Sequence, residues 1–250
     1  MDNQAQQTYL PLRQDLRFCR HSEPVTALIW RNSSGMQGIL ITFEGVDGSG
    51  KSTQATMLFQ RLVKEHYKAL LVREPGGTSI SEKIRDLLLD IRNEEMASET
   101  ELLLYAASRA QLVREKVQPK LKKGVVVICD RYTDSTLAYQ GYGRGLNRQF
   151  IQDLNTIVTQ EITPTLTYII DVEIDLAESR TTGSAGPGDR LENEHQAFKQ
   201  RVREGYHAIA ESEPSRVMML SGNESIDDLH EQIWEVTVQQ LETIKKFESQ

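Results

Sequence analysis

Residues 45–52 read Gly-Val-Asp-Gly-Ser-Gly-Lys-Ser, the pattern G-x-x-x-x-G-K-S, and they follow an apolar run at 38–43. A helix-forming stretch at 53–66 comes next, so the pattern stands between a predicted strand and a predicted helix, as in a phosphate-binding loop. Glycines let the backbone turn its N–H groups towards an anion, and the helix adds the positive end of its dipole. In such a loop Lys51 reaches the β- and γ-phosphates and the Ser52 hydroxyl binds Mg²⁺. The motif therefore predicts an α/β fold that binds a nucleoside triphosphate.

Short apolar runs rich in β-branched residues alternate with helical stretches from residue 38 onward. The predicted strands are 39–44, 69–73, 125–130, 166–172 and 217–221, and the predicted helices are 51–66, 79–91, 98–118, 147–162, 192–212 and 226–247. Most of the strands are apolar throughout, which is typical of parallel strands covered on both faces. The alternation predicts a five-stranded doubly wound sheet with ligands at the carboxyl ends of its strands.

Composition excludes several other classes of protein. The 250 residues carry a net charge of −7, which argues against a sequence-independent grip on nucleic acid. No apolar run reaches the roughly 18 residues of a membrane span. The two cysteines, Cys19 and Cys129, are far apart, and Cys129 lies in an apolar run, so we interpret it as a small buried hydrophobic residue. These features predict a cytoplasmic protein.

Two segments depart from the alternating pattern. Residues 1–35 are rich in Gln, Arg and Ser without sustained periodicity, and we expect a flexible N-terminal extension. Met36, just before the first strand, is a candidate for the true start of the folded unit. Residues 181–189 combine Gly, Ser, Thr and Pro, a composition that predicts a mobile loop.

Charged side chains lie at the ends of two of the predicted strands and in a glycine-rich stretch after the third. Asp130 ends the third strand, where a carboxylate can hold Mg²⁺ or its waters; a helix cap or an ion pair with Arg131 is the alternative. Arg73 precedes Glu-Pro-Gly-Gly-Thr and Arg144 lies in Gln-Gly-Tyr-Gly-Arg-Gly. An arginine fork matches a phosphate and nearby glycines let a ligand approach, although a single arginine is usually a solvated surface residue.

Tyr105 and Arg109 are four residues apart and share a helix face. Tyr105 can stack on a base while Arg109 bonds the edge of that base. From spacing alone, a packing tyrosine and a surface arginine are favoured. An N-K-x-D guanine-reading motif, expected of a GTPase, does not occur in the sequence.

Taken together, the motifs resemble those of the thymidylate kinases of bacterial type. They occur in family order: the loop motif 43–53, Arg-Glu-Pro-Gly-Gly-Thr at 73–78, Tyr-Ala-Ala-Ser-Arg at 105–109, Asp-Arg-Tyr at 130–132 running on to 141, and Asp-Arg-Leu-Glu at 189–192. The resemblance spans Met36 to the C-terminus. It implies a P-loop nucleoside monophosphate kinase fold over 36–250, with a short lid at about 180–192.

The resemblance also implies a reaction and a set of site residues. It implies transfer of the γ-phosphoryl group of ATP, with Mg²⁺, to dTMP, giving dTDP and ADP. The implied ATP site comprises Gly45, Val46, Asp47, Gly48, Ser49, Gly50, Lys51, Ser52, Thr53, Arg180 and Arg190. The implied dTMP site comprises Asp47, Arg73, Glu74, Arg85, Tyr105, Arg109, Arg131, Thr136, Tyr139 and Gln140. The implied metal site comprises Ser52, Asp47 and Asp130.

Within these sets the resemblance gives some residues particular roles. Arg131 clamps the acceptor phosphate, and Tyr105 replaces the usual phenylalanine under the thymine ring. Arg109 and Gln140 read the base edge, with Arg85 as a further base-side arginine. Tyr139 disfavours a ribose 2′-hydroxyl. Asp47 lies near the metal and the sugar 3′-hydroxyl.

The phosphate-binding loop differs at one place from the loop of the eukaryotic thymidylate kinases. The loop carries Gly48-Ser49 where the eukaryotic type has an arginine, and the stretch 181–189 holds no basic residue that would compensate. Because a transferring phosphoryl group needs added positive charge, we expect Arg180 or Arg190, which flank this stretch, to supply it in catalysis.

Alternatives to this enzyme remain open on the sequence. A kinase for another pyrimidine monophosphate is one, because Arg109 and Gln140 alone do not determine whether the site selects for the 5-methyl group of thymine. A nucleotide-binding module without activity is the other, although Lys51, Ser52, Asp130 and Arg131 are all present. The family is commonly dimeric, so a homodimer through the apolar faces near 98–118 and 147–162 is expected.

Overall fold

The computed structural model describes residues 38–181 and 190–248. Ser33–Gln250 form one compact unit, and the other unit of the chain, Met1–Asn32, lies outside the described residues. The expected extension 1–35, Met36 and most of the expected lid, residues 182–189, also lie outside them. The prediction of a separate N-terminal extension therefore stays a prediction.

The core of the unit is the predicted five-stranded parallel sheet. Its strands are β1 (Leu40–Glu44), β2 (Ala69–Arg73), β3 (Val126–Asp130), β4 (Leu166–Asp171) and β5 (Val217–Ser221), in the order β2-β3-β1-β4-β5. All four pairings are parallel. Each strand falls inside a run predicted from the sequence, so the predicted five-stranded parallel sheet is confirmed.

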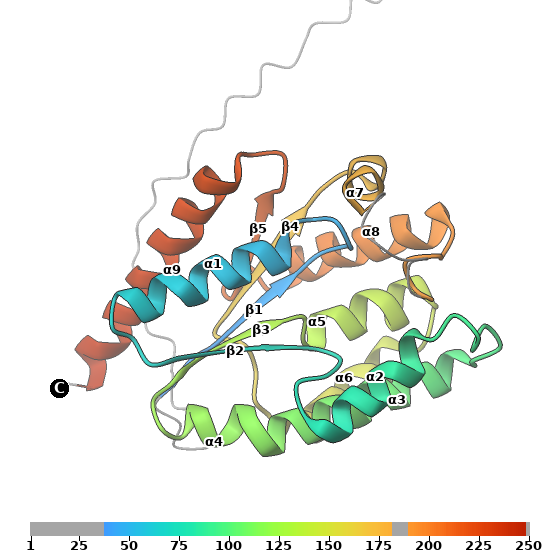
Figure 1. Ribbon diagram of the computed structural model, residues 1–250, viewed down its shortest axis with the longest axis horizontal. Coiled ribbons are helices and arrows are strands. Elements are labelled where there is room, and N and C mark those ends of the chain that lie inside the picture. Colours follow the sequence, from blue (N-terminus) through green and yellow to red (C-terminus); the bar gives the residue numbers. More distant parts are fainter. Residues whose placement is uncertain (1–37, 182–189, 249–250) are drawn as a thin grey trace, which may run out of the picture. The chain divides into compact units, whose positions relative to one another are not determined.

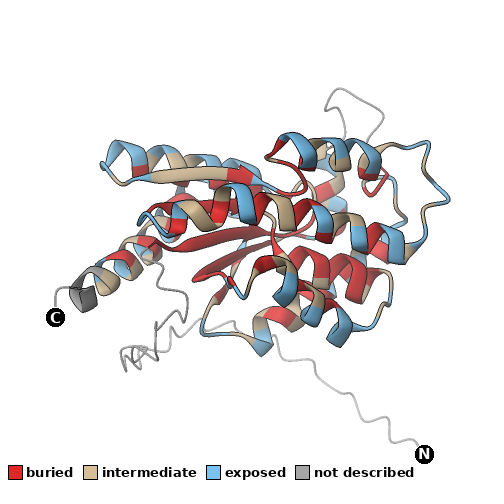
Figure 2. Ribbon diagram, turned by 90° about the horizontal axis from the view of Figure 1, so that it is seen from below, coloured by how far each residue is buried: buried red, intermediate tan, exposed pale blue. Residues whose placement is uncertain are grey.

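Helices cover both faces of this sheet (Figure 1). One face is covered by α1 (Lys51–Lys64) and α9 (Ile226–Glu248), whose Leu58 and Ile233 pack on Ile41 and Phe43. On the other face lie α3 (Ser98–Leu112), α6 (Arg148–Thr159) and α8 (Gln196–Ser212). The remaining predicted helix, α2 (Ser79–Leu89), lies along α3. Figure 2 shows buried strands between helices whose outer faces are exposed, as continuous apolar strands require.

The helix predicted at 98–118 is three consecutive segments. After α3 come a π-helix, η1 (Val113–Val117), and a short helix, α4 (Gln118–Leu121), which contains Pro119. A proline has no N–H to give to the carbonyl four residues earlier, and a wider turn before it accommodates that loss.

Three segments at the edge of the site were not among the predicted helices. They are α5 (Thr133–Thr136), the π-helix η2 (Leu137–Gly143) and α7 (Ile174–Thr181). η2 contains two glycines and is stabilised by packing against α8 rather than by helix propensity. Because a π-helix turns less per residue, the neighbours Tyr139 and Gln140 both face the same pocket.

The parallel register brings the predicted chemistry to one edge of the sheet. Phe43 at the end of β1 pairs with Asp130 of β3, and Asp130 pairs with Arg73 of β2. The phosphate-binding loop leaves β1 at this edge, and the segment Arg131–Gly143 leaves β3 beside it. Across residues 38–181 and 190–248, no helix combines the length and the apolar character needed to cross a membrane.

Candidate active site

The phosphate-binding loop has the backbone that its glycines permit. Gly48 has φ of 80°, and a Cβ atom there would lie 2.2 Å from the carbonyl oxygen of Ala177 in α7. The loop and α7 are therefore in van der Waals contact, and only glycine fits between them. Lys51 is the first residue of α1, and its Nζ donates to Asp47 Oδ1 at 3.0 Å.

Asp47 connects this loop to the end of β3. Its Oδ1 also accepts a hydrogen bond from Arg131 Nη2 at 2.6 Å. Burial disfavours the charged carboxylate, but the neighbouring charges of Arg131 and Lys51 outweigh it and hold the pKa of Asp47 well below its usual range. One ionised carboxylate thus lies between a lysine of the loop and the arginine that directly follows β3.

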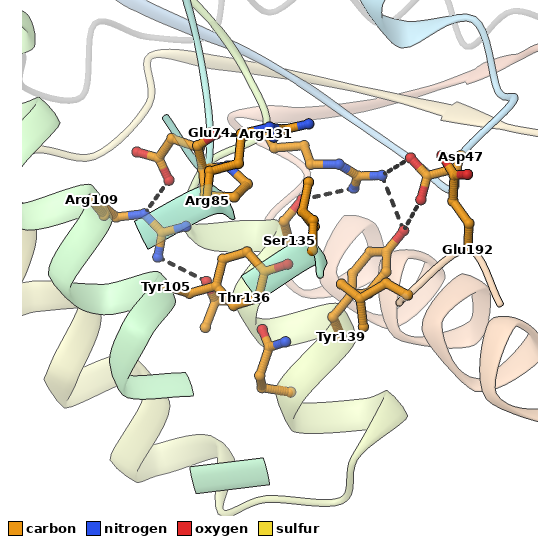
Figure 3. Close-up of a pocket in the computed structure, with 14 residues that line it drawn as sticks. Asp47, Glu74, Arg85, Tyr105, Arg109, Arg131, Ser135, Thr136, Tyr139 and Glu192 are labelled. Atoms are coloured by element: carbon orange, nitrogen blue, oxygen red, sulfur yellow. Dashed lines mark hydrogen bonds and ion pairs between the residues drawn. The ribbon is translucent and has the colours of Figure 1, made fainter. Parts of the chain in front are cut away.

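Arg131 is held on several sides. Its backbone is left-handed, with φ of 70°, a conformation that costs energy for a residue with a Cβ atom. Its Nη1 donates to Ser135 Oγ at 3.1 Å and to the Tyr206 hydroxyl at 3.2 Å, and Nη2 donates to the Tyr139 hydroxyl at 3.1 Å. The guanidinium also lies over the Tyr139 ring, 5.0 Å from its centroid. Figure 3 shows Arg131 between Asp47, Ser135 and Tyr139.

Glu44, the last residue of β1, supports Arg131 from within the core. Its Oε1 accepts from the backbone N–H of Tyr132 at 2.7 Å, and its Oε2 accepts from Ser135 Oγ at 2.5 Å and from the Tyr206 hydroxyl at 3.1 Å. Since both hydroxyl protons point at Glu44, both hydroxyl oxygens present lone pairs to the guanidinium of Arg131. None of the sequence motifs predicts a role for Glu44. An acidic residue closing the buried strand Leu-Ile-Thr-Phe-Glu is the signal that marks it.

The environment of Glu44 gives stability a pH dependence. Burial, and then the nearby charge of Asp134, raise the pKa of Glu44 from 4.5 to about 7. The folded state therefore holds this proton more tightly than the unfolded chain. The contribution to the free energy of unfolding is full below pH 4.5 and is lost as the pH rises through about 7, by about 3 kcal/mol in all.

Substituting Glu44→Gln removes this titration. We expect the fall in unfolding free energy between pH 5 and pH 8 to shrink by about 2.5 kcal/mol, most of the total, relative to the unsubstituted chain, measured by urea denaturation at each pH. Glu65→Gln, an exposed position just after α1, is the matched control and keeps the original slope. An unchanged slope in Glu44→Gln would show that another group titrates.

A pocket opens beside Arg131 and Asp47 and encloses about 620 Å³, counting the solvent at its mouth. It collects side chains from the loop, from the end of β2, from α2 and α3, and from the segment after β3 (Figure 3). The residues that line it are Asp47, Glu74, Pro75, Arg85, Leu89, Tyr105, Arg109, Arg131, Ser135, Thr136, Tyr139, Gln140, Leu191 and Glu192. Nine of the ten residues expected at the dTMP site are among these fourteen, and Arg73 is not.

Arg109 lies in the wall of this pocket and is 1% exposed, so the surface arginine favoured by spacing alone is wrong. Its Nε donates to Glu74 at 2.7 Å, Nη1 to Thr136 at 2.8 Å and to Asn155 at 2.9 Å, and Nη2 to the carbonyl of Tyr132 at 2.9 Å. A guanidinium has five N–H donors, so one on Nη2 is left within the described residues for a ligand.

Gln140 donates its side-chain amide to Glu101 Oε1 at 2.8 Å. Arg144 does not reach towards a phosphate, because it pairs with Glu101 at 3.0 Å and with Glu194 at 2.5 Å. Arg190 pairs with Glu101 at 2.5 Å and donates Nε to the carbonyl of Leu88 at 3.0 Å. Arg190 therefore lies between Glu101 of α3 and the C-terminal end of α2.

The remaining predicted residues are spread around the site. Arg85 donates to the carbonyl of Pro75 at 3.0 Å, and Arg73 donates to the same carbonyl at 2.9 Å and pairs with Glu82 at 2.8 Å. Arg180 lies in the last turn of α7 and donates to the carbonyl of Gly222 at 2.9 Å. Ser52 and Thr53 are exposed in the first turn of α1.

The oxygens expected to hold Mg²⁺ fit that ion. Asp130 pairs with no arginine among the described residues, since Arg131 pairs with Asp47, and the buried Asp130 Oδ1 has no hydrogen-bond partner there. Strand alternation puts Asp130 on the same face as Ile128, the face covered by α1, whose first turn carries Ser52. No group of three or more His, Cys, Asp or Glu ligands occurs in the described residues, which suits a metal that keeps several waters and phosphate oxygens.

This chain is similar to thymidylate kinases in sequence and in structure. The family model described as Thymidylate kinase matches residues 43–233. The thymidylate kinase of Halothermothrix orenii is 45% identical over 201 residues, covering 80% of this chain and 96% of that protein. The thymidylate kinase of Kosmotoga olearia is 45% identical over 196 residues, covering 78% and 93%. The crystal structure of thymidylate kinase from Ehrlichia chaffeensis superposes with a TM-score of 0.65 at 35% identity, covering 80% of this chain and 98% of that one.

Proposed function

This chain belongs to the thymidylate kinase family and transfers the γ-phosphoryl group of ATP to dTMP, and we propose how its residues divide that reaction. The phosphate-binding loop takes the phosphates of ATP, and the pocket beside it takes dTMP. The observation that carries this division is Asp47, whose carboxylate bonds Lys51 of the loop and Arg131 at the mouth of the pocket. The phosphates of ATP and dTMP would thereby lie on the two sides of the Asp47 carboxylate.

On the donor side, the backbone N–H groups of residues 45–53 surround the ATP phosphates, and Lys51 neutralises the β- and γ-oxygens. Ser52, Asp47 and Asp130 would hold Mg²⁺ or its waters. The ion, when bound with ATP, shields the charge on the phosphate oxygens. The orphaned Asp130 Oδ1 supports this proposal.

On the acceptor side, Arg131 clamps the 5′-phosphate of dTMP. The Glu44 contacts fix the backbone and the guanidinium of Arg131 before the substrate arrives, so less ordering is needed on binding. Asp47 accepts from the sugar 3′-hydroxyl. The Tyr139 hydroxyl, 3.4 Å from Asp47 Oδ2, fills the space that a ribose 2′-hydroxyl would take.

The base lies deeper in the pocket. Tyr105 stacks on the thymine ring, and Arg109 uses its remaining N–H on the O4 atom. Gln140 faces the N3 position. Thr136 and Glu74 hold Arg109 in place, and Arg85 and Arg73 are arranged around the carbonyl of Pro75 at the edge of the base site.

The chemistry needs no general base, because the attacking oxygen belongs to a phosphate that is already ionised at pH 7. The barrier comes from repulsion between two anions and from the alignment of donor and acceptor. Fixed arginine and lysine charges and pre-formed geometry lower this barrier. This agrees with a site built from cations and carboxylates around Asp47.

A panel of monophosphates tests the part of the proposal that concerns the acceptor pocket, namely that its base-side residues select thymine. ADP release from ATP with Mg²⁺ is measured for the full chain with dTMP, dUMP, dCMP and UMP. We expect the highest kcat/KM with dTMP. A different preferred substrate would identify a different monophosphate kinase, and no turnover with any of them would leave only a nucleotide-binding module.

We also propose a cytoplasmic homodimer. Leu103 of α3 and Phe150 and Ile157 of α6 are 54%, 54% and 73% exposed, and the two helices contact each other on the same side of the sheet. Such exposed apolar side chains on adjacent helices fit a second copy of this chain.

Ile157→Asp tests the dimer. A buried charge in the middle of an apolar interface should weaken association by at least about tenfold and shift the chain to monomer in light scattering at micromolar concentration. Ile226→Asp is the matched control, since Ile226 is 59% exposed on α9, across the sheet. A dimer that survives Ile157→Asp places the interface elsewhere.

A further inference from the structure

Glu101 of α3 lies behind the base end of the pocket and is fully buried. Its carboxylate accepts from Gln140 Nε2 at 2.8 Å and from Arg144 Nε at 3.2 Å and Nη2 at 3.0 Å, and it pairs with Arg190 at 2.5 Å. Gln140 lines the pocket, whereas Glu101 does not. Glu101 thus contacts the proposed base-reading residue Gln140 but does not itself face the base.

The protonation of Glu101 decides how the amide of Gln140 is turned. Burial opposes ionisation, but hydrogen bonds from Arg144 and Gln140 and the charge of Arg190 keep the pKa of Glu101 below its usual value. An ionised carboxylate only accepts hydrogen bonds, so Gln140 must turn its NH₂ group towards it. Within the described residues Gln140 Oε1 has no hydrogen-bond partner, and this oxygen is left for the ligand.

We propose that Glu101 is a positioning residue for base specificity, because it holds the Gln140 amide with its carbonyl oxygen towards the base. The inference rests on the proposed function, in which Gln140 faces N3 of the base. A carbonyl oxygen there accepts from the N3–H of thymine or uracil. It meets a lone pair on N3 of cytosine.

The contact from Arg109 to the base also favours thymine or uracil over cytosine. The remaining N–H of Arg109 Nη2 matches the O4 oxygen of thymine or uracil but faces the amino group of cytosine. The pocket therefore offers one donor and one acceptor in an order that cytosine reverses. If the Gln140 amide turned over, its NH₂ group could donate to N3 of cytosine. Gln140 Oε1 would then face the Glu101 carboxylate, which now lies 2.8 Å from Gln140 Nε2, and the two acceptors would repel each other.

The variant Glu101→Gln tests whether Glu101 sets the orientation of the Gln140 amide. The new side chain keeps a carbonyl oxygen at the Oε2 position for Arg144 Nη2 and Arg190. At the Oε1 position it presents NH₂ to Gln140, which then turns its own NH₂ towards the base, and it gives up the bond from Arg144 Nε. We expect the ratio of kcat/KM for dTMP to that for dCMP to fall by at least roughly 100-fold, since a mispaired polar contact inside a site can cost this much or more. The ratio for dTMP to dUMP should change less than about threefold, because the two bases share the same edge.

A merely structural role would lower kcat/KM for dTMP, dUMP and dCMP by similar factors, and that result overturns the inference. Gln140→Leu serves if Glu101→Gln does not fold: it removes the oriented amide, and we expect it too to lower the dTMP to dCMP ratio. An unchanged ratio in this variant equally overturns the inference. If the unsubstituted chain turns over no dTMP, the proposed function itself fails, which the same assay shows separately.

Discussion

Replacing Lys51 with methionine is expected to lower kcat by about 10²–10³-fold while KM for dTMP changes by less than about threefold. Methionine keeps the length and the apolar stem of lysine but removes the charge that Asp47 contacts and that we propose acts on the donor phosphates. That charge acts on oxygens whose negative charge must be stabilised during transfer, so its loss raises the barrier more than it weakens binding. Steady-state kinetics with saturating ATP measure both constants.

Lys64→Met is the matched control. Lys64 is exposed at the other end of the same helix, α1, so the same substitution there should leave kcat unchanged. In Lys51→Met, Asp47 keeps its ion pair with Arg131, so we expect the fold to remain intact. Thermal unfolding of both variants checks this, and an unchanged melting temperature would assign the loss of kcat to the missing charge. If Lys51→Met retains kcat within a few-fold of the parent, the loop lysine does not act on the donor.

The sheet, and the grouping of charged residues at one of its edges, were predictable because both depend on local patterns. Apolar runs define the strands, and parallel strands bring residues that follow them to one edge, so Asp47, Asp130 and Arg131 could be grouped without coordinates. The thymidylate kinase resemblance then supplied most of the residues that line the pocket.

The supporting residues could not be predicted in the same way. Glu44 bonds Tyr206, which is 162 positions later, and Glu101 bonds Gln140, which is 39 positions later. No spacing rule connects such pairs, since they meet only after the sheet and its helices are assembled. The burial of Arg109 depends likewise on Glu74, Thr136 and Asn155 from three other segments.

The geometry also separates two arginines that the sequence leaves equivalent. Arg180 lies on α7, which contacts the phosphate-binding loop where Ala177 approaches Gly48. Arg190 is bound to Glu101 on the base side of the pocket. We therefore expect Arg180, rather than Arg190, to supply the charge that the loop lacks at Ser49.

Arg180→Ala is expected to lower kcat by at least about 10²-fold, since an arginine that neutralises a transferring phosphoryl group is worth roughly 10³–10⁵ in rate. Arg190→Ala should reduce kcat by less than about tenfold and act mainly on the discrimination between dTMP and dCMP through Glu101. Arg92→Ala is the control, because Arg92 is 85% exposed and pairs only with its neighbour Asp90 among the described residues.

The loss of the Arg180 bond to the carbonyl of Gly222 must be distinguished from the loss of its charge. Arg180→Lys retains a cation, so it should recover part of the rate lost in Arg180→Ala, whereas Arg180→Met should not. If neither Arg180→Ala nor Arg190→Ala loses more than a few-fold in kcat, the compensating charge does not come from either arginine. Transfer would then depend on Lys51, Arg131 and the metal alone, and the loop would need no substitute for the arginine expected of the eukaryotic type.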